Sequence, residues 1–537
     1  MHAPESDDLH RAVVALLMAC HWADHYRPEN IEHWIKALQE SYSLGTLPAK
    51  SHAKIAVSFA TNLGNRTETL PTAWAKLALE SHWPVLDLHD KLQVLCSATT
   101  TMAAAKERRQ QMAEVIHELR KHAHDDTTPS ELKQAYHIDR LFNYLDPIIN
   151  LAATSGEADY LYRLLCDWYG VSSSKVRDSP PLFVLSTGNK SILYLGHAGV
   201  LQIRADDMPT IEEMTTVANM ALGTLVTVQN SSHLFENAPA RPGLPNAEIA
   251  KEFADTAEKY YGTYNHPEVA DLIRGESSMI ILPGTQHPVQ PIIYKSFGFT
   301  LPIAVSLEKP LNERPIKQVL IWAPNQTISE EIEIAAVSEV LSKSGISVKI
   351  QSGEQARNRE RFIDAYKDPE NDVFWVISHG EYDHWKPHEV KLMLSYDGEA
   401  SVSFLDLSAI PLDSSHGRRL LILNICDGAT AASLGGINRL GFSQALACDA
   451  QAVISHIWPV QSIHAAIFGA CLAIGLSQET GHFEGYERTL SILFGGETLL
   501  RKLEEIGHGG VQLAERARSQ GYNPNSVFSW GSPLFLE

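Results

Sequence analysis

The stretch RRLLILNICDGATAA, residues 418–432, contains an apolar run that ends at a cysteine followed by an aspartate and a glycine. An apolar run of this length next to glycine is typical of a fully buried strand in a parallel sheet. Ligands and reacting groups in such sheets lie at the carboxyl ends of the strands. Cys426 stands at that end, which makes it the first candidate for a functional side chain.

A second buried strand is predicted in VFWVIS, residues 373–378, and it ends at His379 and Gly380. His379 precedes Cys426 by 47 residues, close to the spacing of about fifty residues between the catalytic histidine and cysteine of caspases. Two strands of one sheet would thus deliver an imidazole and a thiol to the same edge. The imidazole can take the thiol proton, which is needed because an ordinary thiol is mostly protonated at neutral pH.

Stabilisation of a developing oxyanion is expected from the backbone N–H groups of Gly380 and Cys426, since glycine lets the chain approach a substrate carbonyl closely. The glycine-rich segment and the helix expected directly after Cys426 would add partial positive charge near the sulfur. Taken alone, Cys426 is better explained as a small buried hydrophobic residue. Its pairing with His379 at two strand ends favours the functional interpretation.

Composition narrows the classes of function. The 537 residues, of which 44% are hydrophobic, predict several domains with cores of their own. The formal net charge of −20 argues against nucleic acid as an obligatory partner, because phosphate binding depends on Lys and Arg. No signal peptide or membrane span is predicted. The six cysteines form no CxxC pair, which is typical of reduced thiols in the cytoplasm.

Further histidines lie near the proposed pair in the sequence. The spacing of His379, His384 and His388 fits neither HExxH nor a zinc finger, and no cluster of Asp and Glu argues for calcium. We therefore expect no metal and no cofactor. Four histidines are interpreted as surface or loop residues: His384, His388, His416 and His456.

The spacing of apolar residues changes twice along the chain. Residues 1–178 show helical spacing with short polar joints, which predicts antiparallel helix hairpins; an irregular array is favoured over tetratricopeptide-like repeats, because no clean 34-residue period recurs. Residues 179–314 mix short strand-like runs with helical segments. Residues 315–537 alternate strands and helices, which predicts a parallel sheet sandwiched by helices with right-handed crossovers.

Residues 317–537 resemble the CHAT family of caspase-like cysteine peptidases, and residues 180–310 resemble the degenerate first half often found in the same proteins. The matching pieces are VLIWAP with its following helix, the His379-Gly380 pair, ILNICDGA, GGINRLGFSQALACDAQAVISHIWPV and the closing FSWGSPLFLE. The cysteine motif of the family usually reads S-A-C-E/D-T/S-G. In this chain the residues around the cysteine read N-I-C-D-G-A, so Cys426 and the acidic Asp427 match the motif and their neighbours differ.

The resemblance implies a caspase–hemoglobinase fold, an α/β/α sandwich preceded by a mixed α/β, pseudo-caspase-like half and an all-α region. It implies cleavage of a protein substrate with His379 and Cys426 as the catalytic dyad. It also implies a bacterial setting in which the N-terminal helices sense a protein partner or trigger. A role in antiviral defence or programmed cell death is implied by kinship alone.

Substrate recognition is predicted at the end of AVISHIW, residues 452–458, where an extended peptide could add as a strand. The candidate contacts are Ser455, Ile457 and Trp458. Trp458 is equally well explained as the wall of the P1 pocket, which holds the side chain before the scissile bond, or as core packing. Asp427 would either favour a basic side chain in that pocket or cap the following helix, and the cap is favoured.

Two rival functions belong to other classes. A pseudopeptidase scaffold would bind a protein partner through the helical array while its dyad stays silent, and the intact Cys–His pair argues against it. A nucleotide-binding α/β enzyme is ranked last, because neither GxxxxGK[ST] nor GxGxxG follows any predicted strand.

Overall fold

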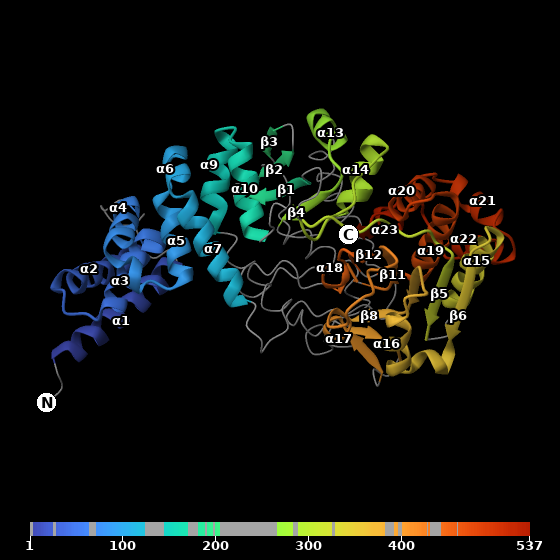
Figure 1. The fold of residues 1–537 in the computed structure, drawn as a ribbon, viewed down its shortest axis with the longest axis horizontal. Coiled ribbons are helices and arrows are strands. Elements are labelled where there is room, and N and C mark those ends of the chain that lie inside the picture. The colour runs from blue at the N-terminus through green and yellow to red at the C-terminus, as the bar shows by residue number, and fades with distance from the viewer. Residues whose placement is uncertain are drawn as a thin grey trace. The chain divides into compact units, whose positions relative to one another are not determined.

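The chain divides into two compact units, residues 1–170 and 171–537 (Figure 1). The structure, a computed structural model, describes residues 4–24, 28–63, 71–123, 144–169, 181–187, 191–196, 199–204, 266–282, 288–324, 328–381, 391–395, 400–426, 428–429, 442–458 and 460–537. The predicted boundary between residues 314 and 315 lies inside the second unit.

The described part of the first unit is helical, as the sequence predicts. Its α-helices are α1 (Pro4–Asp24), α2 (Pro28–Leu44), α3 (Ala49–Ser58), α4 (Pro71–Leu77), α5 (Leu88–Ala98), α6 (Met102–Glu107), α7 (Arg109–Ala123), α9 (Asp146–Thr154) and α10 (Ala158–Tyr169). Short π and 3₁₀ turns are η1 (Phe59–Leu63), η3 (Ala78–His82) and η4 (Trp83–Val85). One hydrophobic core joins α1 through α5, and in it Phe59 stacks on Trp74 with ring centroids 4.5 Å apart.

The second unit combines strands and helices. Its strands are β1 (Leu182–Thr187), β2 (Ser191–Gly196), β3 (Gly199–Arg204), β4 (Met279–Leu282), β5 (Gln318–Ala323), β6 (Ser347–Ser352), β7 (Val373–Ile377), β8 (His379–Glu381), β9 (Lys391–Met393), β10 (Ser401–Ser403), β11 (Arg419–Asn424), β12 (Gln451–His456) and β13 (Pro533–Leu536). Its helices are α13 (Pro267–Arg274), α14 (Val289–Phe297), α15 (Ile328–Lys343), η7 (Gly353–Arg357), α16 (Arg359–Lys367), α17 (Phe404–Ser408), α18 (Phe442–Leu446), α19 (Ser462–Gln478), α20 (His482–Leu493), α21 (Thr498–Glu504), α22 (His508–Ser519) and α23 (Val527–Trp530).

A six-stranded sheet in the order β13-β12-β11-β7-β5-β6 forms the centre of the second unit. Strands β12, β11, β7, β5 and β6 run parallel, and β13 is antiparallel to β12. Every residue of β7, β11 and β12 is buried, which explains their continuous apolar sequences. The predicted parallel sheet is thus confirmed.

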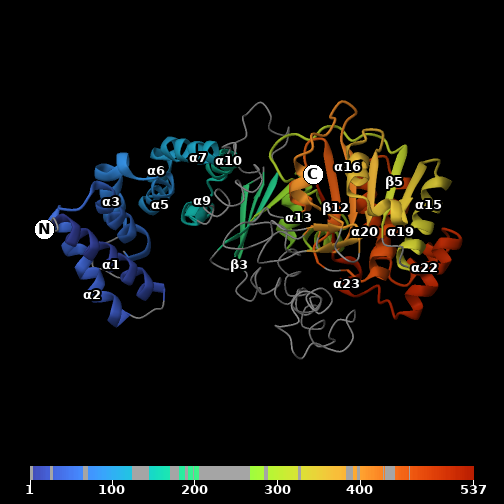
Figure 2. The ribbon, with the colours of Figure 1, turned by 90° about the horizontal axis from the view of Figure 1, so that it is seen from below.

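Helices cover both faces of this sheet. On one face Phe362 of α16 packs against Trp322 of β5 and Phe374 of β7, with centroids 5.3 Å away in each case. On the other face, α15, α19 and α22 contact one another and are grouped beside the strands in Figure 2. Helix α19 is apolar almost all round and correspondingly buried. This is the predicted α/β/α sandwich.

Backbone hydrogen bonds at Ile303 join the two larger sheets of the second unit. A four-stranded sheet, β3-β2-β1-β4, is linked to the six-stranded sheet through Ile303, which bridges Met279 of β4 and Leu536 of β13. The Ile303 N–H donates to the Phe535 carbonyl at 3.1 Å, and the Ile303 carbonyl accepts from Glu537 N at 2.8 Å. Ile303 therefore lies between β4 of one sheet and β13, the edge strand of the other.

A buried arginine secures the base of β11. The Arg418 guanidinium contacts Glu313 Oε1 at 2.7 Å and Glu537 Oε2 at 2.5 Å, and the Arg418 N–H donates to the Asn312 carbonyl at 2.8 Å. Because a buried arginine needs charged partners, this triad ties the residues before β5 and after β13 to the central strand. No helix in the described ranges has the length and apolar character needed to cross a membrane.

Replacing Phe535 with alanine tests whether β13 is an integral part of the second unit. The Phe535 side chain is fully buried and packs on Phe483 with centroids 5.2 Å apart. We expect Phe535→Ala to lower the free energy of unfolding of this unit by about 3–5 kcal/mol, measured by urea denaturation. Ile350→Ala, at a side chain 48% exposed on β6, is the control and should cost less than about 1 kcal/mol. A loss at Phe535 no larger than at Ile350 would contradict the role of β13.

Candidate active site

The strand register brings Cys426 and His379 to the same edge of the sheet. Strands β7 and β11 are parallel neighbours in which Ile377 is paired with Asn424. His379 and Cys426 each lie two residues beyond that pair, and both are half-buried. The two residues predicted from separate strands are therefore adjacent along the carboxyl edge of the sheet, where α/β proteins place their reacting groups.

Gly380 lies directly against the cysteine backbone. A Cβ atom at Gly380 would be 2.0 Å from the Cys426 carbonyl oxygen and 3.4 Å from Ile425 Cδ1. Any side chain at this position would push the two strand ends apart. Besides the predicted approach of a substrate carbonyl, Gly380 is thus needed for its own contact with the backbone of Cys426.

The sulfur of Cys426 faces the backbone that leads into α19. The Val460 N–H donates to Sγ at 3.4 Å, and the thiol is 3.7 Å from the Val460 carbonyl oxygen that accepts from it. Val460 immediately precedes Gln461, the N-cap of α19. The N–H donor and the N-terminus of a 17-residue helix favour negative charge on the sulfur, whereas the carbonyl contact favours the protonated thiol.

The helix beside the sulfur differs from the one predicted directly after Cys426. Residues 427 and 430–441, where that predicted helix falls, lie outside the described residues, and the first described helix after Cys426 is α18. The helix that begins beside the sulfur is α19, which follows the next strand of the sheet, β12. Only the pairing of β11 with β12 brings its N-terminus to the thiol.

His379 is held by a small antiparallel sheet. It begins β8, which pairs with β9, and His379 is opposite Met393 in that pairing; the neighbouring Ser378 hydroxyl donates to the Met393 carbonyl. Burial lowers the pKa of His379 below its ordinary value of 6.5. The imidazole is therefore neutral at pH 7 and can accept a proton.

The predicted peptide-binding strand end is already occupied by the chain itself. Strand β13 pairs with β12 as far as His456, and the Ile457 N–H donates to the Ser532 carbonyl at 2.9 Å. The prediction that a substrate adds as a strand to this end of β12 is therefore wrong, because β13 takes the hydrogen-bonding edge. Ser455 is fully buried, and its hydroxyl donates to the Leu423 carbonyl at 2.8 Å.

The other predicted substrate contacts have different positions. Ile457 is buried, and Trp458 is buried with its ring edge-on to Phe528 at 6.3 Å between centroids. Trp458 thus contributes to the core, one of its two predicted roles, and its place in a P1 pocket stays a prediction. Asp427, His384 and His388 lie outside the described residues.

His456 was interpreted as a loop or surface residue, and this is wrong. It is the last residue of β12, its side chain is 1% exposed, and its ring is edge-on to Phe468 of α19. His416, in contrast, is exposed as predicted. No distinct signal for this burial is present in the sequence, because β12 contains two other polar residues, Gln451 and Ser455, which are also buried.

Asn424 and His456 belong to a buried polar network next to Cys426. Asn424 Nδ2 donates to Glu333 Oε1 at 2.6 Å and to the Ala465 carbonyl at 3.0 Å. Asn424 Oδ1 is 2.7 Å from His456 Nε2, and His456 Nδ1 is 2.8 Å from the Ser532 hydroxyl. The network therefore joins β11 to α15, α19, β12 and the residues before β13.

The hydrogen-bond partners fix the protons of this network. A carbonyl oxygen can only accept, so the contact with Ala465 fixes the NH₂ side of the Asn424 amide. The opposite side, Oδ1, then accepts from His456 Nε2–H, and His456 Nδ1 accepts the Ser532 hydroxyl proton. The imidazole is thus a neutral tautomer with both nitrogens satisfied.

Burial keeps the whole network uncharged. It lowers the pKa of His456 to about 3 and raises the pKa of Glu333 to about 8. At pH 7 His456 is neutral and most Glu333 is protonated. The carboxyl lies against Gly469 of α19, where an added Cβ would be 2.4 Å from Glu333 Oε1, so the glycine makes room for the acid.

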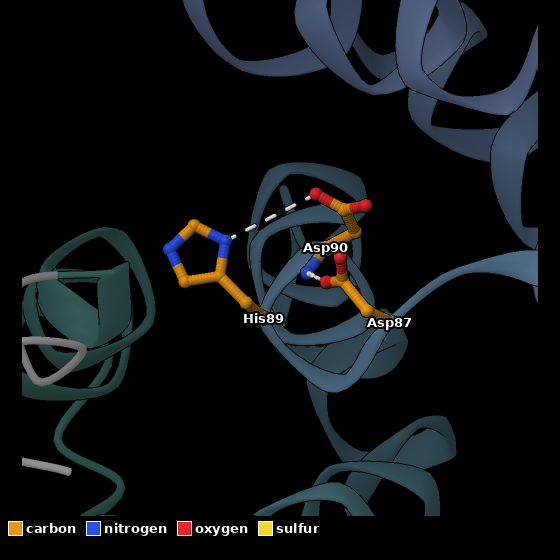
Figure 3. Close-up of side chains that lie close together, drawn as sticks. All are labelled: Asp87, His89 and Asp90. Atoms are coloured by element: carbon orange, nitrogen blue, oxygen red, sulfur yellow. Dashed lines mark hydrogen bonds and ion pairs between the residues drawn. The ribbon is translucent and has the colours of Figure 1, made fainter. Parts of the chain in front are cut away.

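Among the described residues, one cluster in the first unit has ligand types suited to a metal ion, namely Asp87, His89 and Asp90 (Figure 3). Lys54 pairs with both carboxylates and offsets part of their charge, since its Nζ is 2.5 Å from Asp90 and 3.5 Å from Asp87. Asp87 Oδ1 also accepts from Asp90 N at 2.9 Å and so caps α5. These contacts explain the cluster as a helix cap with an ion pair.

Comparison with models of protein families matches residues 282–481 to the model described as the CHAT domain. The match includes β5 through β12, and with them His379, Cys426 and three residues of the buried network, Glu333, Asn424 and His456. None of the curated proteins compared with the chain matches it.

The raised pKa of Glu333 predicts a specific pH dependence of stability. Between the ordinary carboxyl pKa of 4.5 and about 8, the folded state keeps a proton that the unfolded state releases, so stability falls as pH rises through this window. Glu333→Gln removes the titrating group and keeps the acceptor oxygen. We expect the difference in free energy of unfolding, Glu333→Gln minus wild type, to increase with pH by up to about 1.4 kcal/mol per pH unit.

Urea denaturation from pH 4.5 to 8 measures this difference. Glu331→Gln, on the exposed side of the same helix, is the matched control for an added amide, and the rise with pH should be confined to Glu333→Gln. Parallel curves for wild type and Glu333→Gln across the window would show that the carboxyl ionises normally.

Proposed function

Residues 282–481 of this chain form a CHAT domain, a domain of the caspase-like clan, and on this basis we propose that the protein is a cysteine endopeptidase acting through Cys426 and His379. The observation that carries the proposal is the contact of Gly380 with the Cys426 backbone at the ends of two parallel strands. Further support comes from the lowered pKa of His379 and from the N-terminus of α19 beside the sulfur of Cys426.

The proposed reaction uses the dyad in two steps. His379 accepts the thiol proton, and Sγ of Cys426 attacks the scissile carbonyl carbon to form a tetrahedral oxyanion. Backbone N–H groups of Gly380 and Cys426 are the proposed donors to that oxyanion. The imidazolium then protonates the leaving amine as the C–N bond breaks, and water, deprotonated by His379, hydrolyses the thioester to release the acid and restore the thiol.

Control of this site is assigned to the first unit as part of the same proposal. Residues 1–170 form a compact body with its own core, and they include none of the residues of the dyad or its network. A helical body of this kind suits recognition of a protein partner or trigger that activates cleavage. A cytoplasmic location and a role in bacterial immunity or cell death are the setting that the kinship of the domain suggests.

A scaffold function is the alternative, in which the CHAT domain binds a protein and cleaves nothing. The two proposals differ in the reactivity of the cysteine. A peptide chloromethyl ketone library should label Cys426 of a peptidase, at least once the activating partner is present. A scaffold would leave Cys426 unlabelled under every condition in which its partner binds.

Substitution of the dyad tests the peptidase directly. Cys426→Ala and His379→Ala should each lower cleavage of a proteome-derived peptide library by at least about 10³-fold while leaving the circular dichroism spectrum unchanged. The library is incubated with the full chain in lysate that supplies candidate activators, and new N-termini are identified by mass spectrometry.

Cys448→Ala is the matched control. Cys448 is another half-buried cysteine, and it precedes β12 at the opposite edge of the sheet, where its N–H donates to the Gln451 carbonyl. The Cys448→Ala protein should cleave the library at the wild-type rate. Cleavage that persists in Cys426→Ala would exclude the proposed mechanism.

A further inference from the structure

We infer that Asn424 is a positioning residue for the nucleophile, which holds the start of α19 in the place where the Val460 N–H meets the sulfur of Cys426. The inference rests on the proposed function in that it assigns Asn424 a part in preparing the same thiol. It concerns how the thiolate is stabilised, and it can be tested without any substrate.

The geometry shows two contacts between the end of β11 and the start of one helix. Cys426 Sγ meets the backbone of Val460, and Asn424 Nδ2 donates to the Ala465 carbonyl at 3.0 Å. The Ala465 N–H in turn donates to the Gln461 carbonyl at 3.0 Å, so Ala465 belongs to the first turn of α19. The amide of the last residue of β11 and the thiol two residues further along the chain thus contact the same helix end.

The network around Asn424 fixes the orientation of the amide that contacts Ala465. Glu333 accepts from the amide nitrogen, and His456 donates to the amide oxygen, so the amide is held on both sides. Each of these side chains is at least 97% buried. Burying polar groups costs free energy even when they are hydrogen-bonded, and leucine or valine would fill this space at lower cost.

Such a cost is expected where a fixed geometry is needed. Apolar side chains pack well in more than one register, whereas hydrogen bonds specify both distance and angle. Reactive groups have to be held to within about 0.5 Å by supporting residues. Asn424 is placed to give that precision to the distance between Sγ and the Val460 N–H.

The test measures how easily Cys426 forms its thiolate. In the full-length chain, the rate of alkylation of Cys426 by iodoacetamide is followed from pH 5 to 10 by mass spectrometry of the Cys426 peptide. We expect Asn424→Ala to move the apparent pKa of this reaction up by at least one unit, so that alkylation near pH 6 slows about tenfold. Where cleavage is measurable, kcat should fall with KM nearly unchanged.

Asn371→Ala is the matched control for loss of a buried asparagine. Asn371 is fully buried, its amide accepts from Gln318 Nε2 at 3.1 Å, and it precedes β7 at the amino edge of the sheet. The substitution should lower stability without moving the alkylation profile. A folded Asn424→Ala protein with the wild-type profile, or an equal shift in Asn371→Ala, would overturn the inference.

A second pair of variants keeps the test decisive if Asn424→Ala does not fold. His456→Gln retains an N–H donor toward the Asn424 oxygen and should keep the wild-type profile, whereas His456→Leu removes the donor and should shift it. Equal profiles for the two folded variants would count against the inference. Because alkylation needs no substrate, a shifted profile in a protein that cleaves nothing would support the positioning role while rejecting the peptidase.

Discussion

The candidate active site depends on the close approach of two neighbouring strand ends. Parallel pairing of β7 with β11 sets Ile377 beside Asn424, and the chain then places Gly380 against the carbonyl of Cys426 with no space for a side chain. This contact fixes the separation of the segments that carry the imidazole and the thiol. Buried strands on both sides keep the sheet from relaxing at this point, since interiors are close-packed and transmit strain.

The groups that favour negative charge on the sulfur, the Val460 N–H and the N-terminus of α19, follow Cys426 by more than thirty residues in the sequence. The N-terminus of α19 lies beside Cys426 because β12 is the next strand of the sheet, and Asn424 joins that helix to β11. The network behind it is neutral, with burial holding the proton on Glu333 and off His456. A charged network at this depth would need ionic partners; neutral hydrogen bonds give direction without that requirement.

Strand β13 connects the site to the rest of the second unit. It covers the edge of β12 that a peptide would otherwise use, and Ile303 continues its hydrogen bonds to β4. The residues just before it include Ser532, which contacts His456. Hydrogen bonds therefore connect β13 both to the mixed α/β half and to the network beside Cys426, although hundreds of residues separate these parts in the sequence.

By itself the sequence determined the parallel sheet, its helical layers, and the candidate residues His379 and Cys426, because buried strands have continuous apolar sequences and reacting groups follow their carboxyl ends. It could not identify the helix beside the sulfur, the reason for Gly380, or the burial of His456. Those features depend on which strand lies next to which, and pairing between β11, β12 and β13 is a long-range choice that local periodicity does not encode. The tertiary structure alone decided them, because hydrogen bonds such as that from Asn424 to Ala465 join residues 41 positions apart.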